Sequence, residues 1–157
     1  MASSTPHTIM LSDHPEWVRD EAKANSVAIT PGDLIEPVGA GLVQLHSTQA
    51  GNAQPFFAIE NPWADDNTVA AINDDYGTTD TVFFIKGQPG QQVYAWLTVG
   101  ANAAAHGLLE SAGSLGALQT ATAEGTVTAP RRFVARALEA VNNSAGTVPA
   151  RIKVEIL

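Results

Sequence analysis

Few residues of this sequence have the types and spacing that catalysis requires. Residues 112–116, AGSLG, differ at one position from the G-x-S-x-G nucleophile elbow, in which a strand precedes the serine and a helix follows it. Ser114 is followed by further threonines and glycines with no helical pattern. All four histidines precede Ser114, whereas the catalytic histidine of that fold follows its serine. We therefore expect a glycine-rich turn between strands, and no catalytic residue.

Metal and cofactor chemistry has equally little support. The chain has no cysteine, and its four histidines lack the spacing of a zinc site. A loop over residues 61–80 carries carboxylates of the kind that calcium and magnesium prefer, but without the pattern of an EF-hand. A solvated loop is the simpler interpretation, and a metal or glycan site there is left open. The aspartates of this loop are Asp65, Asp66, Asp74, Asp75 and Asp80. The sequence thus predicts no cofactor, no metal and no enzyme.

The charge distribution limits the possible partners. Charged residues make up 15% of the 157 residues, against about 25% in an average soluble domain, which suggests that part of the surface is covered. Between residues 24 and 130, Lys86 is the single basic residue, so the chain is unsuited to neutralise a phosphate backbone. No apolar run is long enough to cross a bilayer, and residues 1–6 do not resemble a secretory signal. We expect no nucleic-acid partner, no membrane partner and a cytosolic protein.

The elements that would position any site are mostly strands. Residues 27–30 and 34–38 flank Pro31-Gly32, which predicts a strand, a tight turn and a second strand. Further strands are predicted over residues 42–46, 56–59, 81–85 and 93–99. Residues 151–156 alternate between charged and apolar side chains, as in a half-buried strand. Residues 101–105 and 133–141 fit a helix, although the second segment fits strand alternation as well.

These elements predict an all-β fold, a small barrel or sandwich of short strands with an extended N-terminal arm and at most one or two short helices. We assign residues 1–25 to the arm, with a helical turn capped by Asp13, and residues 26–157 to a single β-rich domain. Trp17 and Trp63 are of the residue type that anchors interfaces, whereas Trp96 lies within a predicted strand and is expected in the core. The basic C-terminal segment, which begins at Arg131 and Arg132, could meet an acidic protein or be an ordinary solvated face.

Several segments, taken in order, resemble the head decoration (cement) proteins of tailed bacteriophages. No single motif is very specific, but the ordered set covers almost the whole chain from about Thr8. The segments are ITPGDLIE at 29–36, His46 with AGNA at 50–53, FAIE at 57–60, INDDY at 72–76, VYAWL at 93–97, GLLES at 107–111, ARALEAV at 135–141 and RIKV at 151–154. The family often has a Gly-Asp pair where this chain has Gly90-Gln91 and Gly107-Leu108.

The resemblance implies a structural role. Such proteins bind the outside of an expanded capsid, bridge neighbouring major capsid protein subunits, and resist the pressure of the packed genome. It implies a location on the outer surface of the virion after assembly in the host cytoplasm, and a homo-oligomer, with a trimer preferred over a dimer. Contacts with the capsid or within the oligomer are expected at Ile9, Met10, Leu11, Trp17, Trp63, Arg131 and Arg132.

Two alternatives stay open. One is another β-module of the virion surface, for example a carbohydrate-binding or host-attachment domain that uses Trp63, Tyr76 and the acidic loop. The other is a small hydrolase, which the near-elbow at Ser114 alone favours. For the arm, we expect strand addition or apolar docking onto the capsid, and we expect the domain to remain folded when residues 1–25 are deleted.

Overall fold

The computed structural model describes residues 6–12, 16–62, 70–113, 115–121 and 133–157. These residues form twelve strands and one short 3-10 helix, which confirms the all-β prediction. In chain order the elements are β1 (Val18–Ala24), β2 (Ile35–Gly39), β3 (Leu42–Leu45), β4 (Phe56–Ala58), η1 (Ala71–Asn73), β5 (Thr81–Lys86), β6 (Gln92–Leu97), β7 (Asn102–Ala103), β8 (Leu108–Ser111), β9 (Leu118–Thr120), β10 (Ala135–Ala137), β11 (Val141–Asn142) and β12 (Ala150–Ile156).

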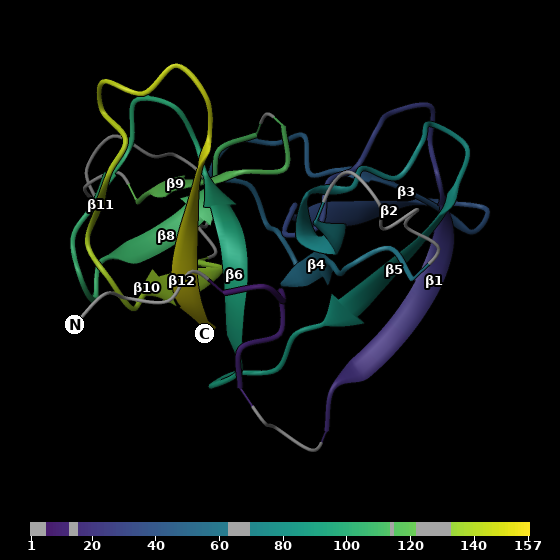
Figure 1. The fold of residues 1–157 in the computed structure, drawn as a ribbon, viewed down its shortest axis with the longest axis horizontal. Coiled ribbons are helices and arrows are strands. Elements are labelled where there is room, and N and C mark those ends of the chain that lie inside the picture. The colour runs from purple at the N-terminus through teal and green to yellow at the C-terminus, as the bar shows by residue number, and fades with distance from the viewer. Residues whose placement is uncertain (1–5, 13–15, 63–69, 114, 122–132) are drawn as a thin grey trace.

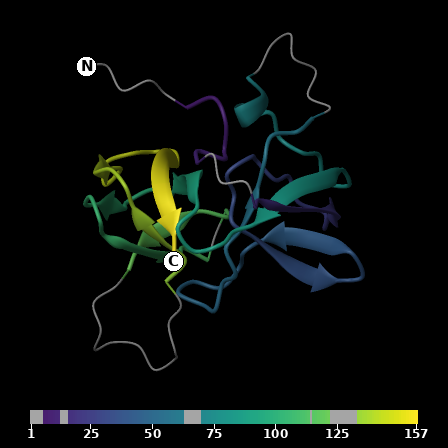
Figure 2. The same cartoon turned by 90° about the horizontal axis from the view of Figure 1, so that it is seen from below.

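The strands build two parts that lie side by side (Figure 1). The first part is an open five-stranded sheet in the order β2-β3-β1-β5-β4. The second is a closed barrel in the order β10-β12-β6-β9-β8, accompanied by the two-stranded ribbon β11-β7. The view from below in Figure 2 again separates the barrel, which contains the C-terminal strand, from the open sheet.

The barrel follows the predicted alternation of its strands. Ile152, Val154 and Ile156 on β12 are buried, while the residues between them are partly exposed. Strand β12 pairs antiparallel with β6 over six residues and with β10 over three, and these pairs place its apolar face inside the barrel. Each buried branched side chain contributes about 1.5–3 kcal/mol to folding, so this strand is a large part of the barrel's stability.

A single hydrophobic cluster crosses from the barrel to the open sheet. It includes Val93 and Leu97 from β6 together with Leu34, Phe57 and Ile85 from the sheet side, all fully buried. A second cluster belongs to the sheet alone and surrounds residues such as Ile29 and Tyr76. The shared cluster fixes the sheet against the barrel, so a site that uses residues of both parts has a defined geometry.

The second half of the region assigned to an arm, from Val18 on, is part of the fold. Residues 18–24 form β1, which lies between β3 and β5 and pairs with β5 from Val18 to Lys23. Four of the seven side chains of β1 are charged, and most are exposed. The strand is therefore held mainly by backbone pairing and lacks the apolar alternation by which a strand is recognised in a sequence. Because deletion of residues 1–25 removes a strand from the interior of the sheet, we now expect that variant to unfold.

The two segments that fitted a helix are extended instead. Residues 102–103 form β7, and residues 135–137 and 141–142 form β10 and β11, so the alternation interpretation of residues 133–141 was the right one. The turn predicted at Asp13 lies outside the described residues, and the first strand begins at Val18. Among the described residues, no helix is long and apolar enough to span a bilayer.

Candidate interaction site

The predicted Pro31-Gly32 turn is present, and it places a carboxylate between the two parts of the molecule. Gly32 has a φ of +93°, which favours glycine, and the N–H of Asp33 donates to the carbonyl of Thr30 at 3.0 Å. The Thr30 N–H in turn donates to Oδ2 of Asp33 at 2.7 Å. These two hydrogen bonds fix Asp33, which is only 5% exposed.

A cross-strand pair supports this turn from the barrel. Arg151 on β12 lies opposite Trp96 on β6, and its guanidinium carbon is 3.8 Å from the centroid of the indole ring. Nη1 of Arg151 donates to the carbonyl of Pro31 at 2.7 Å and to that of Tyr94 at 3.3 Å. The indole N–H of Trp96 also donates to the Pro31 carbonyl, at 3.1 Å. The turn is therefore held on the barrel by the hydrogen bonds to the Pro31 carbonyl, and the cation–π contact with Trp96 positions the guanidinium that donates one of them.

Burial dominates the electrostatics of Asp33. It raises the pKa of this carboxyl to about 7, although the Thr30 N–H and the Arg151 cation lower the pKa and the Asp75 carboxylate raises it further. Burial also lowers the pKa of Arg151 to about 10, so this guanidinium is still a cation at neutral pH. Asp33 thus changes its charge near neutral pH beside a fixed positive charge.

Asp33 lines a pocket of about 460 Å³ at the boundary of the two parts. The open-sheet side supplies Leu45 at the end of β3, and the barrel side supplies Trp96. Leu115, from the loop between β8 and β9, and Val148, from the segment before β12, are 64% and 67% exposed. We call the pocket formed by Asp33, Asp75, Leu45, Trp96, Leu115 and Val148 the Asp33 pocket.

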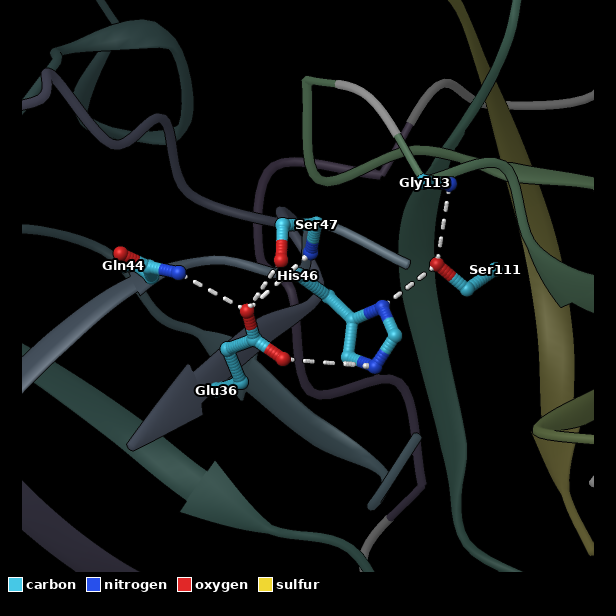
Figure 3. Close-up of polar contacts among 6 residues, drawn as sticks. All are labelled: Glu36, Gln44, His46, Ser47, Ser111 and Gly113. Atoms are coloured by element: carbon cyan, nitrogen blue, oxygen red, sulfur yellow. Dashed lines mark hydrogen bonds and ion pairs between the residues drawn. The ribbon is translucent and has the colours of Figure 1, made fainter. Parts of the chain in front are cut away.

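A second polar group joins the two parts and contains the residue types of a hydrolase triad (Figure 3). Nδ1 of His46, which follows β3, is 2.7 Å from Oγ of Ser111 at the end of β8. Nε2 of His46 is 3.6 Å from Oε2 of Glu36 on β2. The other oxygen of Glu36 accepts hydrogen bonds from Gln44 and Ser47. We call Glu36, His46 and Ser111 the His46 cluster.

The geometry of the His46 cluster indicates that it joins two parts of the fold. Ser111 is fully buried, and its Oγ already accepts the N–H of Gly113 at 3.1 Å, so it is not presented to a substrate. Burial lowers the pKa of His46, and the Glu36 carboxylate opposes this effect. His46 is 4% exposed, and its ring lies between Ser111 on the barrel, its hydrogen-bond partner, and the Glu36 carboxylate on the sheet. The cluster therefore binds β8 of the barrel to β2 and β3 of the sheet.

The described residues of the near-elbow, 112–113 and 115–116, are not helical, and residues 115–116 form part of a turn. The near-elbow connects β8 to β9, both of which are barrel strands, although Ser114 itself lies outside the described residues. Gly113 approaches the neighbouring loop so closely that a Cβ atom there would lie 2.1 Å from the backbone nitrogen of Gln49. The glycine of this segment thus serves close packing of two loops.

The predicted contact residues are divided between the core and the surface. Ile9 is fully buried in the cluster shared by barrel and sheet, and Met10, Leu11 and Trp17 pack partly buried against the same cluster. The backbone of residues 9–11 already bonds to β6, because Ile9 accepts from Tyr94 and Leu11 donates to Gln92. Ile9 therefore offers no side-chain surface to a partner, and these backbone groups are engaged within the chain. Trp63, Arg131 and Arg132 lie outside the described residues.

The residues proposed for glycan or metal binding that the structure describes form no such site. Tyr76 is fully buried, and its hydroxyl donates to the carbonyl of Ile59 at 2.9 Å, so its ring is not available to stack on a sugar. Among the described residues, no group of three or more histidine, aspartate or glutamate side chains is placed to hold a metal ion. Asp65 and Asp66 lie outside the described residues.

Sequence analysis missed the Asp33 pocket. Trp96 was assigned to the core, but its ring is half-buried and lines the pocket. Asp33 appeared only as a turn residue, and Arg151 only as the polar side of a strand. A buried acid in a turn and an arginine opposite a tryptophan are weak signals until the fold brings them together.

Comparison with known proteins yields a similarity of fold. No protein-family model matches the chain, and no curated protein matches it. Among solved structures, the chain is similar to the N base of the head fibre protein gp8.5 of bacteriophage phi29, with a TM-score of 0.52 and 14% sequence identity. The similarity covers 90% of this chain and 95% of that one. The barrel and the open sheet together therefore form an arrangement that also occurs in a protein of a phage head.

Proposed function

We propose that this protein is a structural component of a phage virion, which binds the outer surface of the capsid and bridges subunits of the major capsid protein. The observation that carries the proposal is the fold shared with the phi29 head fibre base over 90% of the chain. The ordered resemblance to head decoration proteins is an independent argument, because it comes from sequence segments distributed over both the barrel and the sheet.

The proposed action is mechanical and needs no catalysis. A standard interface of about 1,600 Å² ranges from weak to strong, whereas an oligomer that contacts several subunits gains through effective concentration. We therefore propose a homo-oligomer, with a trimer preferred and a dimer possible. The protein would bind the outer surface of the capsid in the host cytoplasm, where both proteins are made. This binding would need no metal or cofactor.

The contact surface proposed here excludes Ile9 but keeps the other predicted residues. Met10, Leu11 and Trp17 retain partly exposed side chains beside the barrel. Arg131 and Arg132 stand in the one basic region of an acidic chain and can pair with capsid carboxylates. Trp63 completes the set as an aromatic anchor.

Binding to purified expanded heads that lack this protein tests the proposal. We expect the protein to cosediment with such heads at micromolar concentration, and an R131A/R132A variant to bind less and to lose salt dependence. A K86A variant, which removes a basic residue on the open sheet, is the matched control. The proposal is wrong if the heads bind neither the unaltered protein nor the K86A variant. Mass measurement of the free protein distinguishes a trimer from a dimer.

A further inference from the structure

The Asp33 pocket contains a carboxylate whose bonding is incomplete. Among the described residues, the Asp33 carboxylate accepts one hydrogen bond, from the Thr30 N–H to Oδ2 at 2.7 Å. The side chain is 95% removed from solvent, yet it lines an open pocket. A buried carboxylate is costly unless it is fully hydrogen-bonded or paired, so the pocket has an unused capacity to bind a donor or a cation.

The entrance of the same pocket is aliphatic. Leu115 and Val148 are the two most exposed large hydrophobic side chains of the described residues, and both lie at this pocket. Leu45 adds a partly buried surface from the end of β3. Apolar side chains exposed together beside a polar group are typical of a binding surface.

We propose that the Asp33 pocket binds a lysine or arginine side chain of a partner protein. The aliphatic stem of that side chain packs against Leu45, Leu115 and Val148. Its cationic group is received by the carboxylates of Asp33 and Asp75. The partner segment is basic, and apolar residues flank the basic one, because Leu115 and Val148 are both well exposed at this pocket.

Charge complementarity favours this occupant. The chain has a net charge of −8, and Asp75 is an exposed carboxylate at the pocket. Arg151 does not neutralise the site fully, because its guanidinium is held on the Trp96 ring and on the Pro31 carbonyl, and the pKa of Asp33 is still about 7. A second cation at the pocket would favour the ionised form of Asp33.

A glycan fits the same surface less well. Sugars bind through many directional hydrogen bonds beside an aromatic ring, and here the ring of Trp96 is accompanied mainly by aliphatic side chains. Thr30, Asp33 and Asp75 are the polar side chains of the pocket. A basic side chain needs a carboxylate and an apolar channel, which are the features that this pocket combines.

A peptide titration tests the inference directly. The probe is acetyl-Ala-Leu-Lys-Leu-Ala-amide, and the control is the same peptide with norleucine in place of lysine. Binding is followed by NMR at the indole N–H of Trp96, which the W96F variant assigns. We expect the lysine peptide to shift this signal in a saturable manner and the norleucine peptide to bind about tenfold more weakly or not at all. Equal binding of the two peptides would overturn the inference.

Variants locate the site. D33N keeps an oxygen for the Thr30 N–H but removes the charge, and we expect it to bind the lysine peptide about tenfold more weakly. L115S and V148S should each weaken binding a few fold, while E21Q, which removes an exposed acid on β1, should leave it unchanged. Each variant is first shown to keep the wild-type NMR spectrum outside the pocket. If E21Q lowers binding as much as D33N does, the attraction is general to an acidic protein and the inference fails.

Two further measurements separate the alternatives. Cellobiose, added in place of the peptide, should leave the Trp96 signal unshifted, and a saturable shift by the sugar would assign the pocket to glycans instead. The lysine peptide should bind more weakly at pH 6 than at pH 8, because Asp33 is protonated below about pH 7 beside Arg151 and Asp75. The inference does not depend on the capsid. If this protein binds heads but does not bind the lysine peptide, the inference is refuted and the proposed function is unaffected.

Discussion

The His46 cluster and the Asp33 pocket both lie where the barrel meets the open sheet, and they differ in how completely their polar atoms are bonded. In the His46 cluster, the ring nitrogens face Ser111 and Glu36, and the serine oxygen also accepts a backbone N–H. In the Asp33 pocket, Oδ2 of the carboxylate accepts the Thr30 N–H, and the side chain lines an open cavity. Residue types that suggest catalysis can thus join the two parts of a fold through contacts within the chain, while a turn aspartate can line an open pocket.

The largest effect should come from the arginine beneath the pocket. R151A leaves the carbonyls of Pro31 and Tyr94 without their charged donor and removes the cation from Trp96. We expect the free energy of unfolding to fall by about 3 kcal/mol, measured by urea denaturation. R151K keeps the charge but loses the planar fork, so it should recover only part of this loss. A loss below about 1 kcal/mol for R151A would show that the turn is held by other contacts.

The second-largest effect should come from the His46 cluster. H46A removes the group between Glu36 and Ser111, and we expect a loss of about 2 kcal/mol in the free energy of unfolding. A double-mutant cycle with S111A should give a coupling energy of about 1 kcal/mol, because the two side chains share a buried hydrogen bond. If the losses of stability in H46A and S111A are additive, the two side chains are not coupled. The contrast between the His46 cluster and the Asp33 pocket would then be weaker.

The pH dependence of stability should have opposite signs at the two sites. The folded-state pKa of Asp33 is about 7, above its value in an unfolded chain, so its contribution to stability decreases as the pH rises from about 4 to 7. The pKa of His46 is lowered by folding, so its contribution is present above about pH 6.5 and is lost as the pH falls.

The D33N and H46Q variants separate these contributions. D33N should raise the free energy of unfolding at pH 8 by about 1–2 kcal/mol relative to the native protein, with little change at pH 4. H46Q should reduce the loss of stability between pH 6.5 and 5. If D33N is less stable than the unaltered protein at pH 8, the ionised carboxylate of Asp33 is well paired. The Asp33 pocket would then resemble the His46 cluster.

The smallest effect on stability should come from the rim of the pocket. L115S and V148S change side chains that are 64% and 67% exposed, so each should alter the free energy of unfolding by less than about 0.5 kcal/mol. Thermal denaturation at constant pH measures this. A larger loss would place these side chains in the stabilising core and remove the reason to regard them as a binding surface.

The sequence predicted strands well where the side chains carry the signal. Strands β5 and β12 were recognised because one is a run of β-branched and aromatic residues and the other alternates between buried and exposed positions. Strand β1 was missed because VRDEAKA is mostly exposed and is fixed by its register with β5, a partner about sixty residues away along the chain. Long-range pairing of this kind leaves no local pattern.

The sites show the same limit. His46 and Ser111 are 65 residues apart in sequence, and Asp33 and Trp96 are brought together by a turn that docks on the barrel. Sequence analysis identified the Pro31-Gly32 turn, since proline and glycine determine it locally. It had no means to predict that the next residue would be buried beside a pocket.

The position of β12 has a consequence for how this protein is made. The barrel closes only when β12 pairs with both β6 and β10, and β12 follows the other barrel strands along the chain. The earlier barrel strands must therefore wait with their apolar faces unpaired during synthesis, when such chains are most prone to aggregate. A chain that lacks β12 cannot close the barrel, so the barrel folds only after residues 150–156 have been synthesised.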